Sequence, residues 1–203
     1  MPGRGSGAHP GAATDSPALA AEGPAPGDSR TFDAHAMNDE SVFEVKRSEI
    51  EGLGLFAARA FEAGQRVRKI HVVREITSDA PLRPEAGERL DHCDYPDGKV
   101  LLIGYPDRHL NHSCDPNAFV KFEGEDSYIV ARRRIQAGEE ITCDYNLNIS
   151  GGTAWPCHCR SARCLGTVLG DYFLLPPEIQ LEYRPLLAEW FVRRHADRLA
   201  RVE

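Results

Sequence analysis

The sequence lacks long hydrophobic runs, and this absence excludes a large class of proteins. No apolar stretch approaches the roughly 20 residues that a membrane-spanning helix needs. The first residues, Met-Pro-Gly-Arg-Gly-Ser-Gly, also lack the apolar core of a secretory signal. We therefore expect no membrane partner and a location in the cytoplasm, or in the nucleus if the source is eukaryotic.

The chain also lacks the basic stripe that nucleic-acid-binding proteins carry. Its net charge is −7, and residues 1–40 hold two basic and six acidic side chains, so the remaining residues carry only −3. A domain with so little net charge neither attracts phosphate strongly nor repels a basic peptide. We expect no direct nucleic-acid partner and no charge barrier against a lysine-bearing peptide.

Residues 1–38 contain few large apolar side chains and are rich in Gly, Ala, Pro and Ser. Such a segment cannot bury enough surface to offset the entropy lost on ordering. We predict a disordered tail over residues 1–38.

The six cysteines are unevenly placed, because three of them fall within the short segment Cys157–Cys164. In an intracellular protein, such a cluster indicates metal binding more than a disulfide. Structural zinc needs four tetrahedral ligands, whereas Cys157, Cys159 and Cys164 supply three. No cysteine follows, and His158 stands awkwardly between two ligands. The residues alone leave the fourth ligand open, and a redox pair or a chance cluster is the alternative.

The stretch His-Leu-Asn-His-Ser-Cys-Asp-Pro-Asn, residues 109–117, places amide, imidazole, hydroxyl and thiol groups side by side. Pro116 disfavours a helix at Asp115. Polar groups in this density are buried only if they find dedicated hydrogen-bond partners. Taken alone, the stretch would be an Asx-rich surface turn.

Two further stretches flank it: Gly52-Leu53-Gly54 upstream and Ala-Gly-Glu-Glu-Ile-Thr-Cys-Asp-Tyr-Asn, residues 137–146, downstream. Two glycines around one residue permit unusual backbone torsions and close approach of a ligand. A lone Gly-x-Gly is most often a turn, and this one lacks the strand-to-helix setting of a dinucleotide site. Only its order relative to the other motifs makes this Gly-x-Gly a candidate ligand site.

Taken in order, the four stretches resemble a SET domain followed by a post-SET cysteine segment, over roughly residues 42–166. That family comprises protein lysine methyltransferases that use S-adenosylmethionine. The resemblance implies a mainly β, β-clip-like fold of short curved strands with a threaded, knot-like active-site segment. It places the SET domain at 39–149, the post-SET zinc segment at 150–170 and a C-terminal helical extension at 171–203.

The resemblance also implies roles for particular residues. Tyr145 would be catalytic, its hydroxyl orienting the amine that receives the methyl group; without the motif it would be an ordinary core tyrosine. The implied S-adenosylmethionine contacts are Gly52, Leu53, Gly54, Arg108, Asn111 and His112. A solvated surface arginine is an equal alternative for Arg108. The implied ligands of a structural zinc ion are Cys114, Cys157, Cys159 and Cys164. Where many relatives carry Phe or Tyr, this chain has Cys143, which leaves the number of transferred methyl groups open.

Periodicity and turn residues predict the elements between these motifs. We expect strands at 42–45, 66–77, 99–105 and 139–145, a hairpin from 118–122 and 128–131, and an irregular insert at 78–98. Helices should begin near Pro177 and Pro185, with one apolar face packed on the body or flanking the substrate.

The leading functional prediction is methyl transfer from S-adenosylmethionine to the ε-amine of a lysine in a protein or peptide, by a monomer. One alternative is an inactive SET-like module that binds a peptide or the cofactor. Another is a zinc-stapled interaction domain without chemistry.

Overall fold

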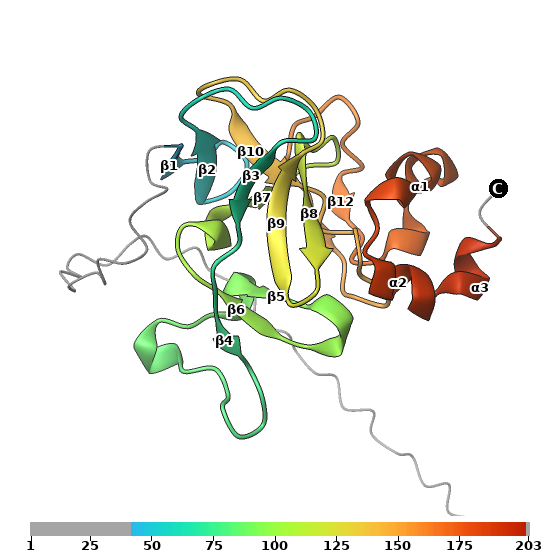
Figure 1. Cartoon of the computed structure of the whole chain (residues 1–203), viewed down its shortest axis with the longest axis horizontal. Helices are drawn as coiled ribbons and strands as arrows, with labels where there is room; N and C mark the ends of the chain where they lie inside the picture. Colours follow the sequence, from blue (N-terminus) through green and yellow to red (C-terminus); the bar gives the residue numbers. More distant parts are fainter. Residues whose placement is uncertain (1–41, 202–203) are drawn as a thin grey trace, which may run out of the picture. The chain divides into compact units, whose positions relative to one another are not determined.

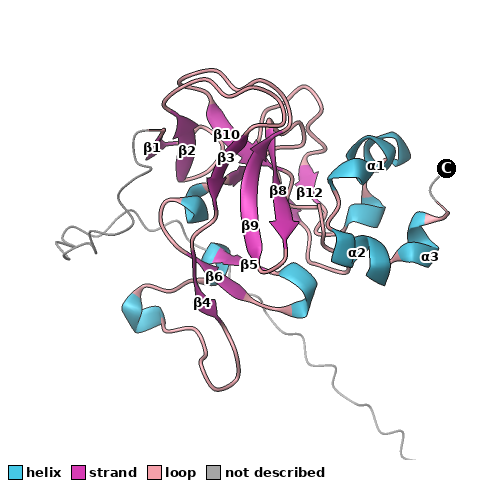
Figure 2. Cartoon of the chain, in the orientation of Figure 1, coloured by secondary structure: helices cyan, strands magenta, loops and turns pink. Residues whose placement is uncertain are grey.

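The computed structural model describes residues 42–201, so the tail predicted at 1–38 lies outside the described residues. The described chain is mainly β, with short strands in small sheets and a few short helices near the C-terminus (Figures 1 and 2). The strands are β1 (Phe43–Arg47), β2 (Leu53–Ala57), β3 (Arg66–Lys69), β4 (Val72–Glu75), β5 (Cys93–Asp94), β6 (Leu101–Ile103), β7 (Asn111–His112), β8 (Ala118–Glu123), β9 (Asp126–Ala131), β10 (Glu140–Cys143), β11 (Trp155–Pro156) and β12 (Thr167–Val168). The predicted mainly β fold is confirmed.

The first sheet, in the order β1-β2-β10-β7, gathers the polar motifs. Strand β10 runs antiparallel to β2 and parallel to the two-residue strand β7, with Thr142 opposite Asn111 and Cys143 opposite His112. The loop between β1 and β2 carries Gly52. Segments far apart in sequence thus reach one sheet.

The second sheet, β3-β9-β8, contains the predicted hairpin. Its strands are longer than expected, because the turn shortens to Gly124-Glu125. Gly124 has φ +63°, a left-handed torsion that glycine adopts without the cost of a Cβ. Side chains on the buried faces of these strands, such as Ile129, belong to the main core.

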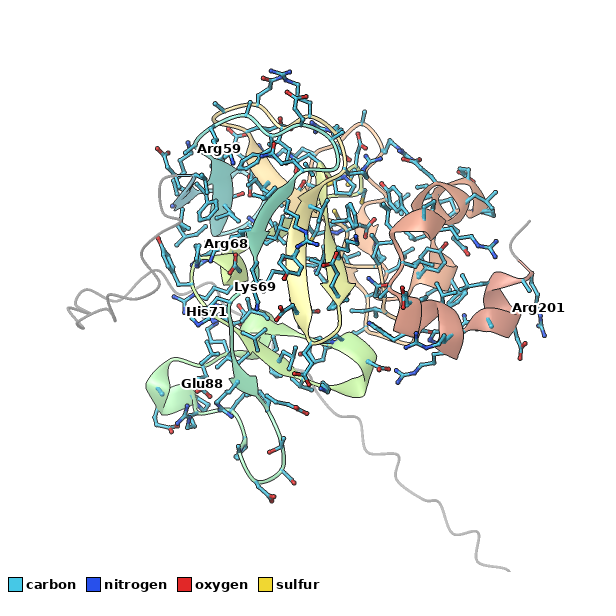
Figure 3. The ribbon with its side chains drawn as sticks, in the orientation of Figure 1. Arg59, Arg68, Lys69, His71, Glu88 and Arg201 are labelled. Carbon is cyan, nitrogen blue, oxygen red and sulfur yellow. The ribbon has the colours of Figure 1, made fainter. Side chains whose placement is uncertain are left out.

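The prediction of one strand over residues 66–77 is wrong, since the chain forms β3 and β4 there. Strand β3 pairs with β9, whereas β4 pairs with β6 in a third sheet. The change of partner occurs at His71, whose N–H donates to the Asp107 carboxylate at 2.8 Å, while Arg68 Nε pairs with the same carboxylate at 2.8 Å. Figure 3 shows Arg68, Lys69 and His71 following one another along this crossing.

The insert at 78–98 is irregular, as predicted, with 3₁₀ turns and the short strand β5 at the edge of the β4-β6-β5 sheet. Glu88 holds it together by pairing with Arg74 and Arg83. Figure 3 shows Glu88 on the part of the insert beside β4.

The C-terminal region forms α1 (Pro177–Tyr183), α2 (Glu189–Arg194) and α3 (Ala196–Leu199), with Pro177 in the first turn of α1 as predicted. These helices lie on the β12 side of the β8–β9 hairpin (Figure 1). Their apolar faces form a second core around Tyr172, Tyr183 and Phe191. None of the helices between residues 42 and 201 combines the length and apolar character needed to cross a membrane.

Candidate active site and metal centre

The four cysteines named from the sequence converge. The sulfurs of Cys114, Cys157, Cys159 and Cys164 all lie within 4.8 Å of one another. Cys157 Sγ is 3.8 Å from Cys114 Sγ and 3.7 Å from Cys164 Sγ. A tetrahedral zinc ion with bonds of about 2.3 Å separates its sulfurs by roughly 3.8 Å, so these distances fit one ion.

Backbone N–H groups point at the sulfurs, as a thiolate cluster requires. The N–H of Leu165 donates to Cys114 Sγ at 3.5 Å, and that of Gly166 donates to Cys164 Sγ at 3.4 Å. Burial opposes ionisation of Cys159, but donors at the Cys114 N–H and at Ser161 outweigh it and lower the pKa of Cys159 to about 6. His158 is exposed and faces Glu51 at 3.5 Å, away from the sulfurs. The donor set therefore suits a divalent ion that favours thiolates.

His112 links this cluster to Tyr145. Its Nδ1 accepts the Tyr145 backbone N–H at 3.1 Å, and its Nε2 lies 3.4 Å from Cys114 Sγ. Burial lowers the pKa of His112 to about 4, so the ring is neutral at pH 7. A neutral ring that accepts at Nδ1 carries its proton on Nε2, which therefore donates to the Cys114 sulfur.

Tyr145 follows β10 and is half-buried beside the same motif. Its hydroxyl donates to the Leu110 carbonyl at 2.6 Å. Its ring lies 5.4 Å from the His112 ring and 6.4 Å from that of the exposed Trp155. Burial raises the pKa of Tyr145, and the acidic groups of Cys143 and Asp94 raise it further. The hydroxyl therefore keeps its proton at neutral pH.

Asn111 joins the loop between β1 and β2, called the glycine loop because it carries Gly52, to strand β10. Its Nδ2 donates to the carbonyls of Glu51 and Leu53, each at 3.1 Å, and to Glu140 Oε1 at 2.8 Å. The Glu140 carboxylate also accepts from Ser48 Oγ at 2.8 Å. The loop around Gly52, strand β7 and strand β10 are thus tied together by one amide and one carboxylate.

Gly52 in this loop and Gly54 in β2 are needed for different structural reasons. Gly52 has φ +46°, and a Cβ there would meet nothing within 4 Å. A Cβ on Gly54 would instead stand 2.2 Å from Glu140 Oε1. Gly52 is required by the turn, whereas Gly54 leaves room for the Glu140 carboxylate.

A cavity of about 390 Å³ opens beside these groups. It lies where β1, the start of the glycine loop, β10 and the cysteine segment meet. Its lining consists of Lys46, Arg47, Glu49, Ile50, Phe56, Glu140, Cys159 and Arg160. Such a volume falls within the range of small-molecule sites in proteins.

Arg108 lies in the 3₁₀ turn Asp107–His109, which packs against β2. Its side chain is exposed and lies beside Tyr105 and His109. It does not line the 390 Å³ cavity. The other five predicted cofactor contacts are also absent from that lining, and Asn111 reaches it through its hydrogen bond to Glu140.

A family model described as the SET domain matches residues 52–146. This region of the chain is a SET domain. The matched residues run from the glycine loop to Asn146 and so contain β2, β7, β10 and Tyr145. The cysteine segment that follows lies outside the match and is joined to it through Cys114.

The SET domain has relatives among histone methyltransferases. Histone-lysine N-methyltransferase 2B from Homo sapiens is 35% identical over 134 residues, which cover 59% of this chain and 5% of that protein. An H3 lysine-36 specific histone-lysine N-methyltransferase from Eremothecium gossypii is 31% identical over 161 residues, covering 68% of this chain and 22% of the relative. The chain thus spans under a quarter of the length of either protein.

Among solved structures, a Plasmodium falciparum protein described as a candidate histone methyltransferase aligns with a TM-score of 0.41 and 21% identity. The alignment covers 51% of this chain and 92% of that one.

Several residues of this SET-domain site were not singled out from the sequence. Ser48 reaches it from the loop after β1, Glu140 from β10 and Trp155 from β11. Glu140 stands inside the motif at 137–146, and its place in the strand expected at 139–145 was the available signal. Ser48 and Trp155 carry no local signal, because only folding brings Ser48 to Glu140 and Trp155 to Tyr145.

Proposed function

We propose that this chain transfers a methyl group from S-adenosylmethionine to the ε-amine of a lysine in a protein. The observation that carries the proposal is that Asn111 is hydrogen-bonded to Glu140 in the lining of a ligand-sized cavity, while the next residue, His112, is hydrogen-bonded to Tyr145. Cys159 of the cysteine cluster is part of the same lining. The histone-lysine methyltransferases among the relatives favour a histone as the substrate. Under this proposal, the chain divides as 39–149, 150–170 and 171–203 into SET domain, zinc segment and helical extension.

Tyr145 acts by orienting the amine. A protonated phenol cannot serve as a base, but its oxygen has lone pairs left after the hydroxyl donates to Leu110. One lone pair accepts an N–H of the substrate amine and aims the nitrogen lone pair along a single line. Alignment of this kind supplies much of the rate enhancement of a displacement between two bound reactants.

The amine must arrive without its proton. A free lysine has a pKa near 10.4, so deprotonation at pH 7 costs roughly 4 kcal/mol. Partial burial between the rings of Tyr145 and Trp155 lowers this cost by disfavouring the charged form. No dedicated strong base is needed beside Tyr145.

The cavity suits S-adenosylmethionine in size and in chemistry. Its lining combines an aromatic ring at Phe56, a cation at Lys46 and the carboxylate of Glu140, which match an adenine, an α-carboxylate and hydroxyl or ammonium groups. When bound, the cofactor supplies the methyl group and a sulfonium charge. Of the predicted contacts at Gly52, Leu53, Gly54, Arg108, Asn111 and His112, Asn111 and Gly54 lie directly against Glu140 of this lining.

Zinc at the four cysteines would hold the segment 157–164 against the Asn111–Cys114 stretch. Structural sites of this kind contribute about 10 kcal/mol or more to folding in small zinc domains. Here the ion would keep Cys159 and Arg160 in the wall of the cavity.

Two measurements test the function. Calorimetry with S-adenosylmethionine should show saturable binding to the full chain. An assay with a labelled methyl group on the cofactor should show transfer to a lysine of recombinant core histones.

Tyr145→Phe should retain cofactor binding and lose turnover by about 100-fold or more, because a misaligned near-attack geometry costs that order of magnitude. Full activity of Tyr145→Phe would contradict its role. Binding without turnover on any histone or proteome extract would leave the inactive SET-like module as the better description.

A further inference from the structure

The buried ion pair between Arg68 and Asp107 lies one turn before the residue that binds the Tyr145 hydroxyl. Arg68 Nε and the Asp107 carboxylate are 2.8 Å apart, and the two side chains are only 13% and 1% exposed. The same carboxylate accepts the backbone N–H of His71 at 2.8 Å. A buried ion pair is weak evidence for stability, because apolar side chains of similar volume often serve as well. Its charges do need partners in fixed places, so the pair holds β3 and the turn at Asp107 in one arrangement.

The turn Asp107–His109 connects this ion pair to Leu110. The N–H of Arg108 donates to the Gly104 carbonyl, and the N–H of Leu110 donates to the Asp107 carbonyl, each at 3.0 Å. Leu110 is itself buried in the main core. Asp107 thus binds β3 through its side chain and Leu110 through its backbone, which leaves the Leu110 carbonyl little freedom to turn.

The Leu110 carbonyl accepts the single hydrogen of the Tyr145 hydroxyl, at 2.6 Å. A neutral lysine amine has two N–H donors and one lone pair, and that lone pair must attack the methyl carbon. A phenol that has already donated its hydrogen can only accept from the amine. A phenol with its hydrogen free would donate to the amine lone pair instead, and this would block the attack. The acceptor at Leu110 therefore decides how the hydroxyl meets the amine.

We propose that Arg68 and Asp107 are positioning residues, which keep the Tyr145 hydroxyl in its accepting orientation by fixing the Leu110 carbonyl. This inference rests on the proposed function for the identity of the amine, whereas the chain of hydrogen bonds is a property of the free protein. The effect belongs to the methyl-transfer step. Binding of the cofactor is unaffected, because neither side chain lines the cavity of about 390 Å³.

The direct test observes Tyr145 by NMR in the full-length chain without substrate. In protein labelled with carbon-13 at the tyrosine Cζ, the signal of Tyr145 is the one that Tyr145→Phe removes. Asp107→Asn should shift this signal, because the hydroxyl loses a correctly placed acceptor. Removing one charge of a buried pair can unfold a protein. Where circular dichroism shows that Asp107→Asn is unfolded, the double variant Arg68→Met with Asp107→Asn decides, since it leaves no buried charge unpaired.

Glu88→Gln is the matched control for a general loss of stability. Glu88 and Arg74 form another largely buried ion pair, 9% and 20% exposed, and Glu88 bonds only within the insert and to β4. The Tyr145 signal should stay in place in this variant. An unchanged signal in the Asp107 variants, or an equal shift in Glu88→Gln, would overturn the proposal.

Turnover tests the consequence for the reaction. With recombinant core histones as substrate, the Asp107 variants should lower kcat about tenfold and leave KM within about threefold, as for one hydrogen bond lost from the reacting geometry. In the Tyr145→Phe background the same changes should cost little more, because no hydroxyl is left to orient. A rise in KM at unchanged kcat, or an equal loss in the Tyr145→Phe background, would contradict the positioning role.

The two readouts also separate this inference from the proposed function. A shifted Tyr145 signal in the Asp107 variants, together with no methyl transfer by the wild type, would refute the proposed function and leave the positioning of the hydroxyl supported. Methyl transfer by a wild type whose Tyr145 signal is insensitive to Asp107 would refute the positioning alone.

Discussion

At the scale of single residues, Glu140 and Gly54 depend on each other. Glu140 accepts hydrogen bonds from Asn111 and Ser48 and forms part of the cavity lining. Its position is available only because residue 54 has no Cβ. The Gly-x-Gly motif was weak evidence from the sequence, and its second glycine is explained by a side chain 86 residues later.

Gly54→Ala should therefore displace the Glu140 carboxylate and weaken S-adenosylmethionine binding about tenfold, the loss expected for one charge-assisted hydrogen bond. Calorimetry on purified variants measures the effect. In a Glu140→Ala background, the same glycine substitution should cost little more, since the clash is gone. Additive losses in the double variant would mean that Gly54 acts through something other than Glu140.

At the scale of elements, the four cysteines gather the cysteine segment against Cys114, and Glu88 with its two arginines holds the insert. The sequence alone named three clustered cysteines, and the family resemblance supplied Cys114 as the fourth. The structure brings all four sulfurs together. Local spacing could not reveal Cys114, because it precedes Cys157 by 43 residues.

Cys164→Ser should release about one equivalent of metal and lower the unfolding temperature markedly, because a three-thiolate site loses much of its affinity. Elemental mass spectrometry and thermal unfolding give the two readouts. Cys93→Ser is the matched control, since Cys93 is also half-buried but lies outside the cluster. A purified wild-type chain without zinc would remove the basis of this prediction.

The insert offers a pH-dependent test. Hydrogen bonds from Arg74, and then Arg83, lower the pKa of Glu88 to about 2. A lowered carboxyl pKa contributes stability above the unfolded value of about 4.5, and this contribution disappears as the pH falls toward 2. Glu88→Gln should thus unfold at a lower temperature than the wild type at pH 7, and the difference should shrink below pH 4.5. A difference that is constant from pH 7 to pH 3.5 would show that charge is not the cause.

At the scale of the whole molecule, the C-terminal extension contacts the cysteine cluster through Cys114. Tyr183 in α1 donates its hydroxyl to the Cys114 carbonyl at 3.2 Å. Glu182 accepts from Arg163 of the cysteine segment and from Arg132 after β9. Helix α1 thus connects the cysteine segment at 157–164 to the residues after β9, which favours the packing prediction for this helix.

Glu182→Gln should accordingly speed the loss of zinc to a chelator by a few-fold, because partly exposed ion pairs contribute modestly even in a network. Release can be followed with a chromogenic zinc chelator in excess. Glu178→Gln, on an exposed site of the same helix, is the control. Identical release rates in all three proteins would show that α1 does not support the metal centre.

The sequence by itself determined the features that depend on near neighbours. Turn residues and alternating apolar positions predicted the β8–β9 hairpin and the irregular insert, and Pro177 predicted the start of α1, since torsions and short-range spacing are set by adjacent residues. The order of the motifs was enough to predict the family.

Only the tertiary structure decided which distant groups meet. It divided the predicted strand at His71, where Asp107 competes for the backbone, and it brought Trp155 to Tyr145 and Glu140 to Gly54. These contacts join residues 10 to 86 positions apart, and packing of the whole core, rather than any local pattern, selects them.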